Sequence, residues 1–92
     1  PTITQPMTNK TARSGDSVKL RCGVTGTPRP TVSWRKNGMV IGQTKDFVQT
    51  YGNNNIATLE INDVCQQDSG SYEMIAKNSG GEISCTCQLI VE

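Results

Sequence analysis

The four cysteines, Cys22, Cys65, Cys85 and Cys87, are the side chains of this sequence with the widest range of chemistry. A cysteine can form a disulfide, bind a metal as its thiolate or act as a nucleophile. Four cysteines allow three different pairings into two disulfides. Cys85 and Cys87 are two residues apart. On a β-strand they would share one face with Cβ atoms about 6–7 Å apart, beyond the reach of a disulfide.

Metal binding and redox activity are both disfavoured by the surroundings of these cysteines. A structural zinc site usually takes four Cys or His ligands with C-x(2–4)-C pairs. This chain has no histidine, and its close pair is C-x-C. Cys65 is the best candidate for a reactive thiol, but Asp63 and Asp68 lie near it in the sequence and would raise its pKa. We therefore predict buried or half-buried thiols and no metal site.

The other reactive side chains form no catalytic arrangement. Without histidine there is no Ser-His-Asp or Cys-His set, and no pair of carboxylates has a spacing that suggests acid–base catalysis. Gly80-Gly81 is read as a hairpin turn, because no glycine-rich phosphate loop stands between a strand and a helix. We predict that the chain is not an enzyme, has no catalytic residue and takes no cofactor.

Length and charge describe one small domain. The 92 residues predict a single domain over 1–92 with one modest core and no deep cleft. Nine Lys/Arg against eight Asp/Glu leave a net charge of +1, which favours neither nucleic acid nor an anionic membrane as a partner. No apolar run approaches the roughly 20 residues that a membrane span needs. We expect a module excised from a larger multidomain chain, monomeric as an isolated domain.

Alternation of apolar and polar residues predicts short β-strands along the whole chain. Turn residues recur every eight to twelve positions, Asn37-Gly38 being the strongest hairpin signal, and no helical periodicity is present. Strands are expected over 1–6, 18–22, 32–34, 39–41, 47–51, 57–61, 72–76 and 83–91. Two stacked antiparallel sheets would bury Val18, Leu20, Cys22, Val32, Trp34, Leu59, Ile61, Tyr72, Met74, Ala76, Leu89 and Val91.

Several motifs, in order and at fixed spacing, give the chain a family resemblance. Trp34 follows Cys22 by twelve residues, within a G-x-P-x-P-x-V-x-W-x-K-x-G pattern over 26–38. The segment 59–64 and then Asp68-Ser69-Gly70-Ser71-Tyr72 lead into a central strand. Together they resemble intermediate-set (I-set) immunoglobulin-like domains of the intracellular titin, twitchin and obscurin type. The resemblance implies an all-β, Greek-key immunoglobulin sandwich.

The resemblance also assigns structural roles to particular residues. The core is expected to be built around Cys22, Trp34, Leu59, Tyr72 and Met74. The hydroxyl of Tyr72 is expected to bond to the backbone near Asp68 and fix the corner before the strand, as in the tyrosine corner of the family.

Met74 is the main departure from the family pattern, because secreted relatives carry a cysteine there that bonds to the one at Cys22. The resemblance places the last strand one strand beyond Met74, so that Cys85 and Cys87 would lie too far from Cys22 for a disulfide. Cys65 has no obvious partner. We predict four free thiols and no disulfide, which is typical of reducing compartments.

The resemblance then implies a function and its alternative. We expect a mechanically stable spacer and docking surface of a giant muscle or cytoskeletal protein, localised in the cytoplasm at the sarcomere or cytoskeleton. Its partners would be neighbouring domains and other sarcomeric proteins, and a kinase domain is possible elsewhere in the parent chain. The alternative is an extracellular adhesion, receptor or matrix domain that has lost its core disulfide. The glycosylation pattern Asn9-Lys10-Thr11 favours that alternative.

Overall fold

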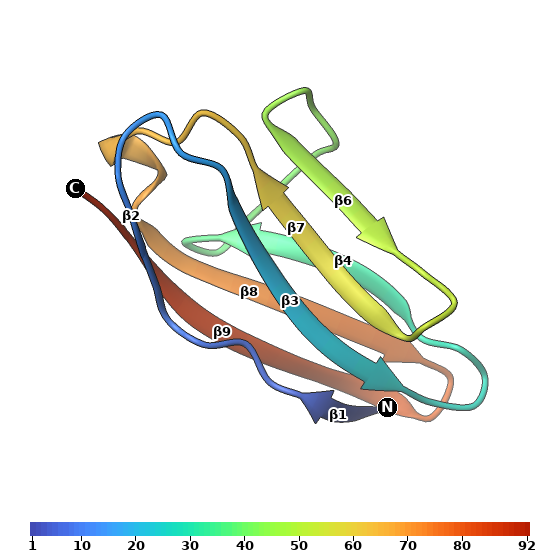
Figure 1. Cartoon of the computed structure of the whole chain (residues 1–92). Helices are drawn as coiled ribbons and strands as arrows, with labels where there is room; N and C mark the ends of the chain where they lie inside the picture. The colour runs from blue at the N-terminus through green and yellow to red at the C-terminus, as the bar shows by residue number, and fades with distance from the viewer.

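The computed structural model describes residues 1–92, which form two β-sheets packed face to face (Figure 1). The elements are β1 Thr2–Gln5, β2 Lys10–Ala12, β3 Val18–Thr25, β4 Thr31–Lys36, β5 Met39–Val40, β6 Phe47–Tyr51, β7 Ile56–Ile61, the short 3₁₀ turn η1 Gln66–Asp68, β8 Gly70–Asn78 and β9 Gly81–Val91. One sheet has the strand order β1-β3-β7-β6 and the other β2-β9-β8-β4-β5. The predicted all-β sandwich is confirmed. No element is a helix with the length and apolarity of a membrane span.

The first predicted strand is two strands in the structure. β1 pairs antiparallel with β3 in one sheet, and β2 pairs parallel with β9 in the other. The chain keeps its direction as it crosses between the sheets, and because β9 runs the same way, this pair is parallel (Figure 1). Pro6 lies in the crossing, where its missing N–H removes no ladder hydrogen bond. The sandwich is therefore antiparallel except at this one pair.

A two-residue hairpin turn and one long strand ladder set the register of the five-stranded sheet. Asn37 and Gly38 have φ angles of 50° and 84°, the left-handed values that a two-residue hairpin between β4 and β5 requires. At the other end of the sheet, β8 and β9 pair without interruption from Gly70↔Leu89 to Asn78↔Gly81. The β8 strand thus lies between β4 and β9 and forms the centre of this sheet.

The core lies between the sheets and follows the predicted alternation closely. Every predicted core residue is buried except Val32, which is half-buried against the core. The buried residues outside the predicted core are Met7, Gly23, Val24, Pro30, Ala57, Val64, Ile75 and Cys87. Ile75 points away from the core but is only 8% exposed, because β8 is a central strand whose outer side chains are flanked on both sides.

Candidate functional site

Tyr72 closes the corner that precedes β8. Its hydroxyl donates a hydrogen bond to the main-chain carbonyl of Asp68, with 2.5 Å between the two oxygens. The Asp68 carboxylate accepts the main-chain N–H of Cys65 at 2.9 Å, which holds the η1 turn from its other end. The ammonium of Lys36 donates to the carbonyl of Gln67 and lies 6.0 Å from the centre of the Tyr72 ring. The corner is therefore bonded both within itself and to β4.

The five residues expected at the centre of the core come together between the sheets. Cys22, Trp34, Leu59, Tyr72 and Met74 are each at most 1% exposed. Trp34 and Met74 are directly paired across β4 and β8, whereas Cys22 and Leu59 belong to the opposite sheet. Met74 and Trp34 therefore form one wall of the core, and Cys22 faces them as a small apolar side chain.

Three of the four thiols gather at one side of this core. Cys22 and Cys87 are buried, Cys85 is half-buried and Cys65 is exposed, and all four are free. Sequence reasoning placed the last strand beyond disulfide reach of Cys22, and no disulfide joins them, but Cys85 is near enough to contribute to the raised pKa of Cys22. This proximity arises because Cys85 is the cross-strand partner of Met74 and shares its inward face. The sulfur of Cys85 also accepts the main-chain N–H of Met7 at 3.3 Å.

The environment of Cys22 and Cys87 disfavours ionisation of their thiols. Burial, with a smaller effect of the neighbouring Cys85, raises the pKa of Cys22 to about 12. Burial also raises the pKa of Cys87, which the nearby Lys10 ammonium partly offsets. A thiol that stays protonated at neutral pH is a poor nucleophile and a poor metal ligand. No group of three or more His, Cys, Asp or Glu side chains is placed to hold a metal ion.

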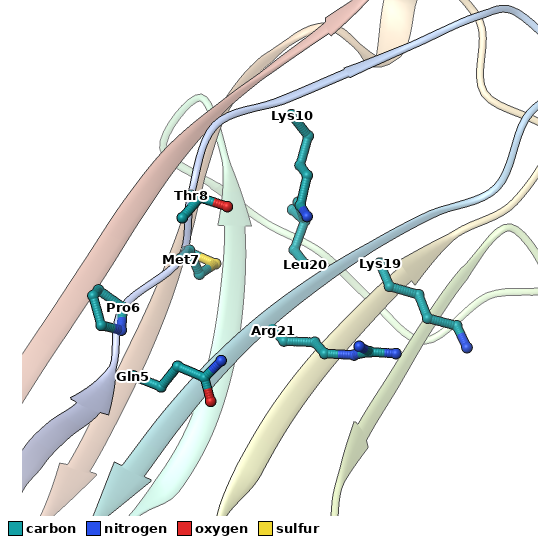
Figure 2. A pocket seen from close by; sticks show the side chains of 8 residues that line it. All are labelled: Gln5, Pro6, Met7, Thr8, Lys10, Lys19, Leu20 and Arg21. Atoms are coloured by element: carbon teal, nitrogen blue, oxygen red, sulfur yellow. The ribbon is translucent and has the colours of Figure 1, made fainter.

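One shallow hollow of about 170 Å³ lies where the crossing between β1 and β2 passes over β3 (Figure 2). Lys10, Lys19 and Arg21 give it a positive charge, and Lys19 and Arg21 point away from the crossing segment. Lys19 is paired with Glu60 at 3.7 Å and is half exposed, so this ion pair adds little stability. The hollow holds no acid–base pair or nucleophile, and it does not resemble an active site.

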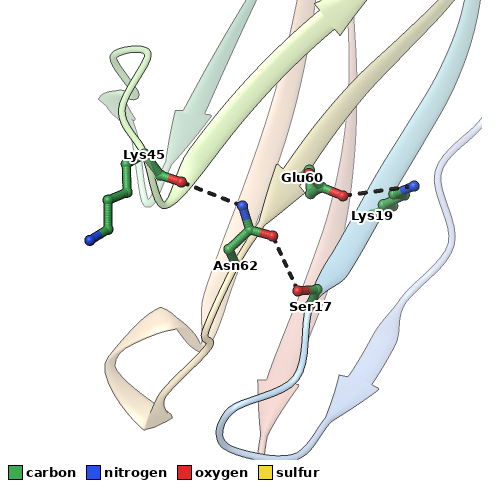
Figure 3. Close-up of polar contacts among 5 residues, drawn as sticks. All are labelled: Ser17, Lys19, Lys45, Glu60 and Asn62. Carbon is green, nitrogen blue, oxygen red and sulfur yellow. Dashed lines mark hydrogen bonds and ion pairs between the residues drawn. The ribbon is translucent and has the colours of Figure 1, made fainter.

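Polar side chains on the same sheet connect its strands near their ends (Figure 3). The Ser17 hydroxyl donates to the side-chain oxygen of Asn62 at 3.1 Å, and the Asn62 amide donates to the carbonyl of Lys45 at 3.4 Å. These bonds join β3 and β7 to the loop before β6. They are structural contacts between neighbouring segments, and none leaves a group aimed at a ligand.

A second, apolar groove of about 500 Å³ lies between β5 and β6. Met39 and Val40 are 74% and 72% exposed, and Ile41 and Phe47 continue the apolar lining into the groove. Large apolar side chains exposed side by side are a feature of protein-interaction surfaces. Met39 and Val40 are the only two large apolar residues that are exposed next to each other in the chain.

Comparison with known proteins agrees with this description. The family model described as "Immunoglobulin I-set domain" matches residues 1–91. Cardiac-type myosin-binding protein C of Rattus norvegicus is 40% identical over 91 residues, which are 99% of this chain and 7% of that protein. The muscle M-line assembly protein unc-89 of Caenorhabditis elegans is 34% identical over 92 residues, all of this chain and 1% of that protein. The solved titin domain M4 superposes with a TM-score of 0.96 at 28% identity, covering 99% of this chain and 94% of that one.

Proposed function

Because the chain belongs to the immunoglobulin I-set family, we propose that it is one domain, over 1–92, of a longer sarcomeric or cytoskeletal protein, in which it acts as a mechanically stable spacer and docking surface. The relatives are muscle proteins, and this chain spans only 7% of the length of the myosin-binding protein C that it matches. Neighbouring domains of the same chain and other sarcomeric proteins would be its partners. The domain itself would perform no catalysis.

The direction of the terminal strands is the observation that carries the spacer proposal. β2 and β9 are parallel, with Lys10↔Leu89, Thr11↔Ile90 and Ala12↔Val91 as partners. The two chain ends lie at opposite ends of the sandwich (Figure 1). A force applied between the ends therefore pulls β2 and β9 past each other along their length. Their ladder hydrogen bonds are then stretched together in shear, which resists extension better than breaking one bond at a time.

The strands that carry this force are also well attached to the rest of the sandwich. The ladder continues past the strand ends, because the Glu92 N–H donates to the carbonyl of Ala12 at 2.8 Å and the Ser14 N–H to the carbonyl of Glu92 at 3.2 Å. β9 is paired with β8 over nine residue pairs. The terminal strand is thus held by two neighbours, as a force-bearing strand needs to be.

The proposal is tested by stretching single molecules of the domain between handles at its two ends, with a matched pair of proline variants in β2. The ladder alternation turns the N–H of Ala12 towards β9 and the N–H of Thr11 away from it. Ala12→Pro should therefore lower the unfolding force clearly, whereas Thr11→Pro should leave it near the wild-type value. Equal forces for the wild type and Ala12→Pro would mean that the β2–β9 pair does not bear the load.

A further inference from the structure

The outer edge of β6 is closed by side chains, although no strand is paired with it. β6 is the last strand of its sheet and pairs only with β7. In an antiparallel pair, alternate residues direct their N–H and C=O groups away from the partner strand. In β6 these are Phe47, Gln49 and Tyr51. Such a row of free groups is the usual template for pairing with another chain.

Gln43 occupies the middle of this edge in the manner of a peptide group. Its side-chain oxygen accepts the main-chain N–H of Gln49 at 2.6 Å, and its side-chain nitrogen donates to the carbonyl of Gln49 at 3.1 Å. One carboxamide thus bonds both outward groups of a single residue, as a neighbouring strand would. In return, the side-chain amide of Gln49 donates to the carbonyl of Ile41 at 2.8 Å, which holds the loop that carries Gln43.

The two ends of the edge are closed in the same way. At the first end, the Phe47 N–H donates to the Thr44 hydroxyl at 3.1 Å, and the Thr44 N–H donates to the Phe47 carbonyl at 3.0 Å. At the other end, the guanidinium of Arg29 donates to the Tyr51 carbonyl at 3.1 Å and lies 3.9 Å from the centre of the Tyr51 ring. The edge is blocked by three side chains and one loop.

The composition of β6 indicates what this arrangement excludes. Natural edge strands are usually protected by a charged side chain, a proline or a bulge, but β6 reads Phe-Val-Gln-Thr-Tyr and contains none of these. Its β-branched and aromatic residues are the types that favour strand pairing. A second copy, laid antiparallel about Gln49, would place Val48 opposite Thr50 and Phe47 opposite Tyr51, with no charge on either strand.

The edge of the other sheet is less suitable for a second copy. β5 has only two residues, so pairing it with itself would form very few ladder hydrogen bonds. We propose that β6 is a latent pairing edge for a second copy of this chain, kept closed at its centre by the carboxamide of Gln43 and at its ends by Thr44 and Arg29. Release of Gln43 frees the two outward groups of Gln49, where the copies first pair, and Thr44 and Arg29 then give way as the four-stranded sheets join edge to edge.

The test is the mass of the protein in solution, measured by sedimentation over a wide range of concentrations. The wild type should remain a monomer, and Gln43→Ala should form a dimer whose fraction rises with concentration. Adding Gln49→Pro to Gln43→Ala removes the N–H at the centre of the proposed pair and should restore the monomer. Gln43→Asn, whose side chain is one carbon shorter, should also form a dimer, but with a smaller dimer fraction than Gln43→Ala at the same concentration.

Two outcomes would overturn the proposal. The first is a Gln43→Ala variant that stays monomeric at every concentration while its Trp34 fluorescence shows a native core. The second is a dimer that survives Gln49→Pro but is lost with Val40→Lys, because the copies would then be meeting through β5. Trp34 is buried in the core, so its fluorescence reports whether the packing between the sheets is native.

Discussion

The hydroxyl of Tyr72 lies 2.5 Å from the main-chain carbonyl of Asp68, four residues earlier in the chain. This bond joins a buried aromatic ring of the central strand to the turn that delivers the chain into that strand. Tyr72 is 0% exposed. Its hydroxyl is the hydrogen-bond donor to the Asp68 carbonyl at the edge of the core, and without Tyr72 that carbonyl would lose this donor. The contact thus links the local geometry of the corner to the packing between the sheets.

Removing this hydroxyl should destabilise the domain. We expect Tyr72→Phe to lower the free energy of unfolding by about 1 kcal/mol or more, because the carbonyl of Asp68 is left without its donor while the ring remains in place. Chemical denaturation followed by Trp34 fluorescence measures the change.

The chain provides a matched control at Tyr51, whose hydroxyl is buried and has no hydrogen-bond partner. Tyr51→Phe keeps the ring under Arg29 and removes only an unsatisfied polar group. It should change the free energy of unfolding by less than about 0.5 kcal/mol, or raise it slightly. If both substitutions had the same effect, the corner hydrogen bond would not be the cause.

Restoring a cysteine at Met74 should create a bridge between the sheets. Met74 and Cys22 lie in opposite walls of the core, and a disulfide between them would close a loop of about 50 residues, worth about 4 kcal/mol in the chain-entropy model. Under oxidising conditions, we expect the thiols at positions 22 and 74 of Met74→Cys to be consumed by the new disulfide and the free energy of unfolding to rise. Under reducing conditions the variant should be less stable than the wild type, because cysteine fills less of the core than the methionine it replaces.

Cys85 complicates that experiment, because it is already the neighbour of the Cys22 thiol. The substitution should therefore also be made together with Cys85→Ala. A gain that disappears without Cys85 would mean that the new cysteine bonds to the last strand instead of Cys22. Unchanged thiol counts in both variants would show that the two positions do not face each other.

The parts of the fold that were predictable are those fixed by neighbours in the sequence. The alternation around Tyr72 and Met74 identifies the inward face of β8, and Asn37-Gly38 defines a hairpin by local backbone preference alone. The division of the first strand was not predictable in this way, because the pairing of β2 depends on β9, at the far end of the chain. Local periodicity contains no information on which distant strand is the partner.

Side-chain contacts between distant segments were the least predictable part of the candidate site. The Cys22–Cys85 contact depends on how the two sheets are stacked, which the spacing of cysteines within a strand does not specify. The Gln43–Gln49 pair depends on the path of a loop, and glutamine at both positions resembles an ordinary polar surface. Only the assembled structure shows that these amides replace a neighbouring strand.

Stability should fall in alkaline solution because of the buried Cys22 thiol. Its ordinary pKa is 9.0, and the folded state raises this pKa to about 12. Below pH 9 both states hold the proton, so the folded state keeps its full advantage. Between pH 9 and 12 the unfolded state loses the proton while the folded state retains it, which favours unfolding by up to about 1.4 kcal/mol per pH unit. Denaturation with reductant at a series of pH values measures this slope.

Two variants assign the slope to a residue. Cys22→Ala should reduce the loss of stability between pH 9 and 12, although its stability at neutral pH is lower because of the cavity. Cys65→Ala, which removes an exposed thiol, should leave the slope unchanged. A slope that is the same in all three proteins would have to come from another group. Cys87 and Tyr72, whose pKa values burial also raises, would then be the first to examine.

Gly23 should be required for the close approach of β1 to β3. A Cβ atom at this position would lie 2.5 Å from the Thr4 hydroxyl oxygen, 3.0 Å from the Cβ of Gln5 and 3.2 Å from the Gln5 nitrogen. Rotation of the Thr4 side chain relieves the first contact, but the Cβ and nitrogen of Gln5 can give way only if β1 itself shifts. Gly23→Ala should displace β1 and lower the free energy of unfolding by about 1–3 kcal/mol.

The position of that loss can be tested as well as its size. Since β1 is an edge strand paired only with β3, Gly23→Ala should speed hydrogen exchange in β1 while the amides shared by β8 and β9 stay protected. Gly42→Ala is the matched control, because a Cβ atom there meets nothing within 4 Å and the backbone needs no left-handed φ. It should be neutral or slightly stabilising, since alanine reduces the freedom of the unfolded chain. Equal losses for the two variants would show that the cost of Gly23→Ala does not come from crowding against β1.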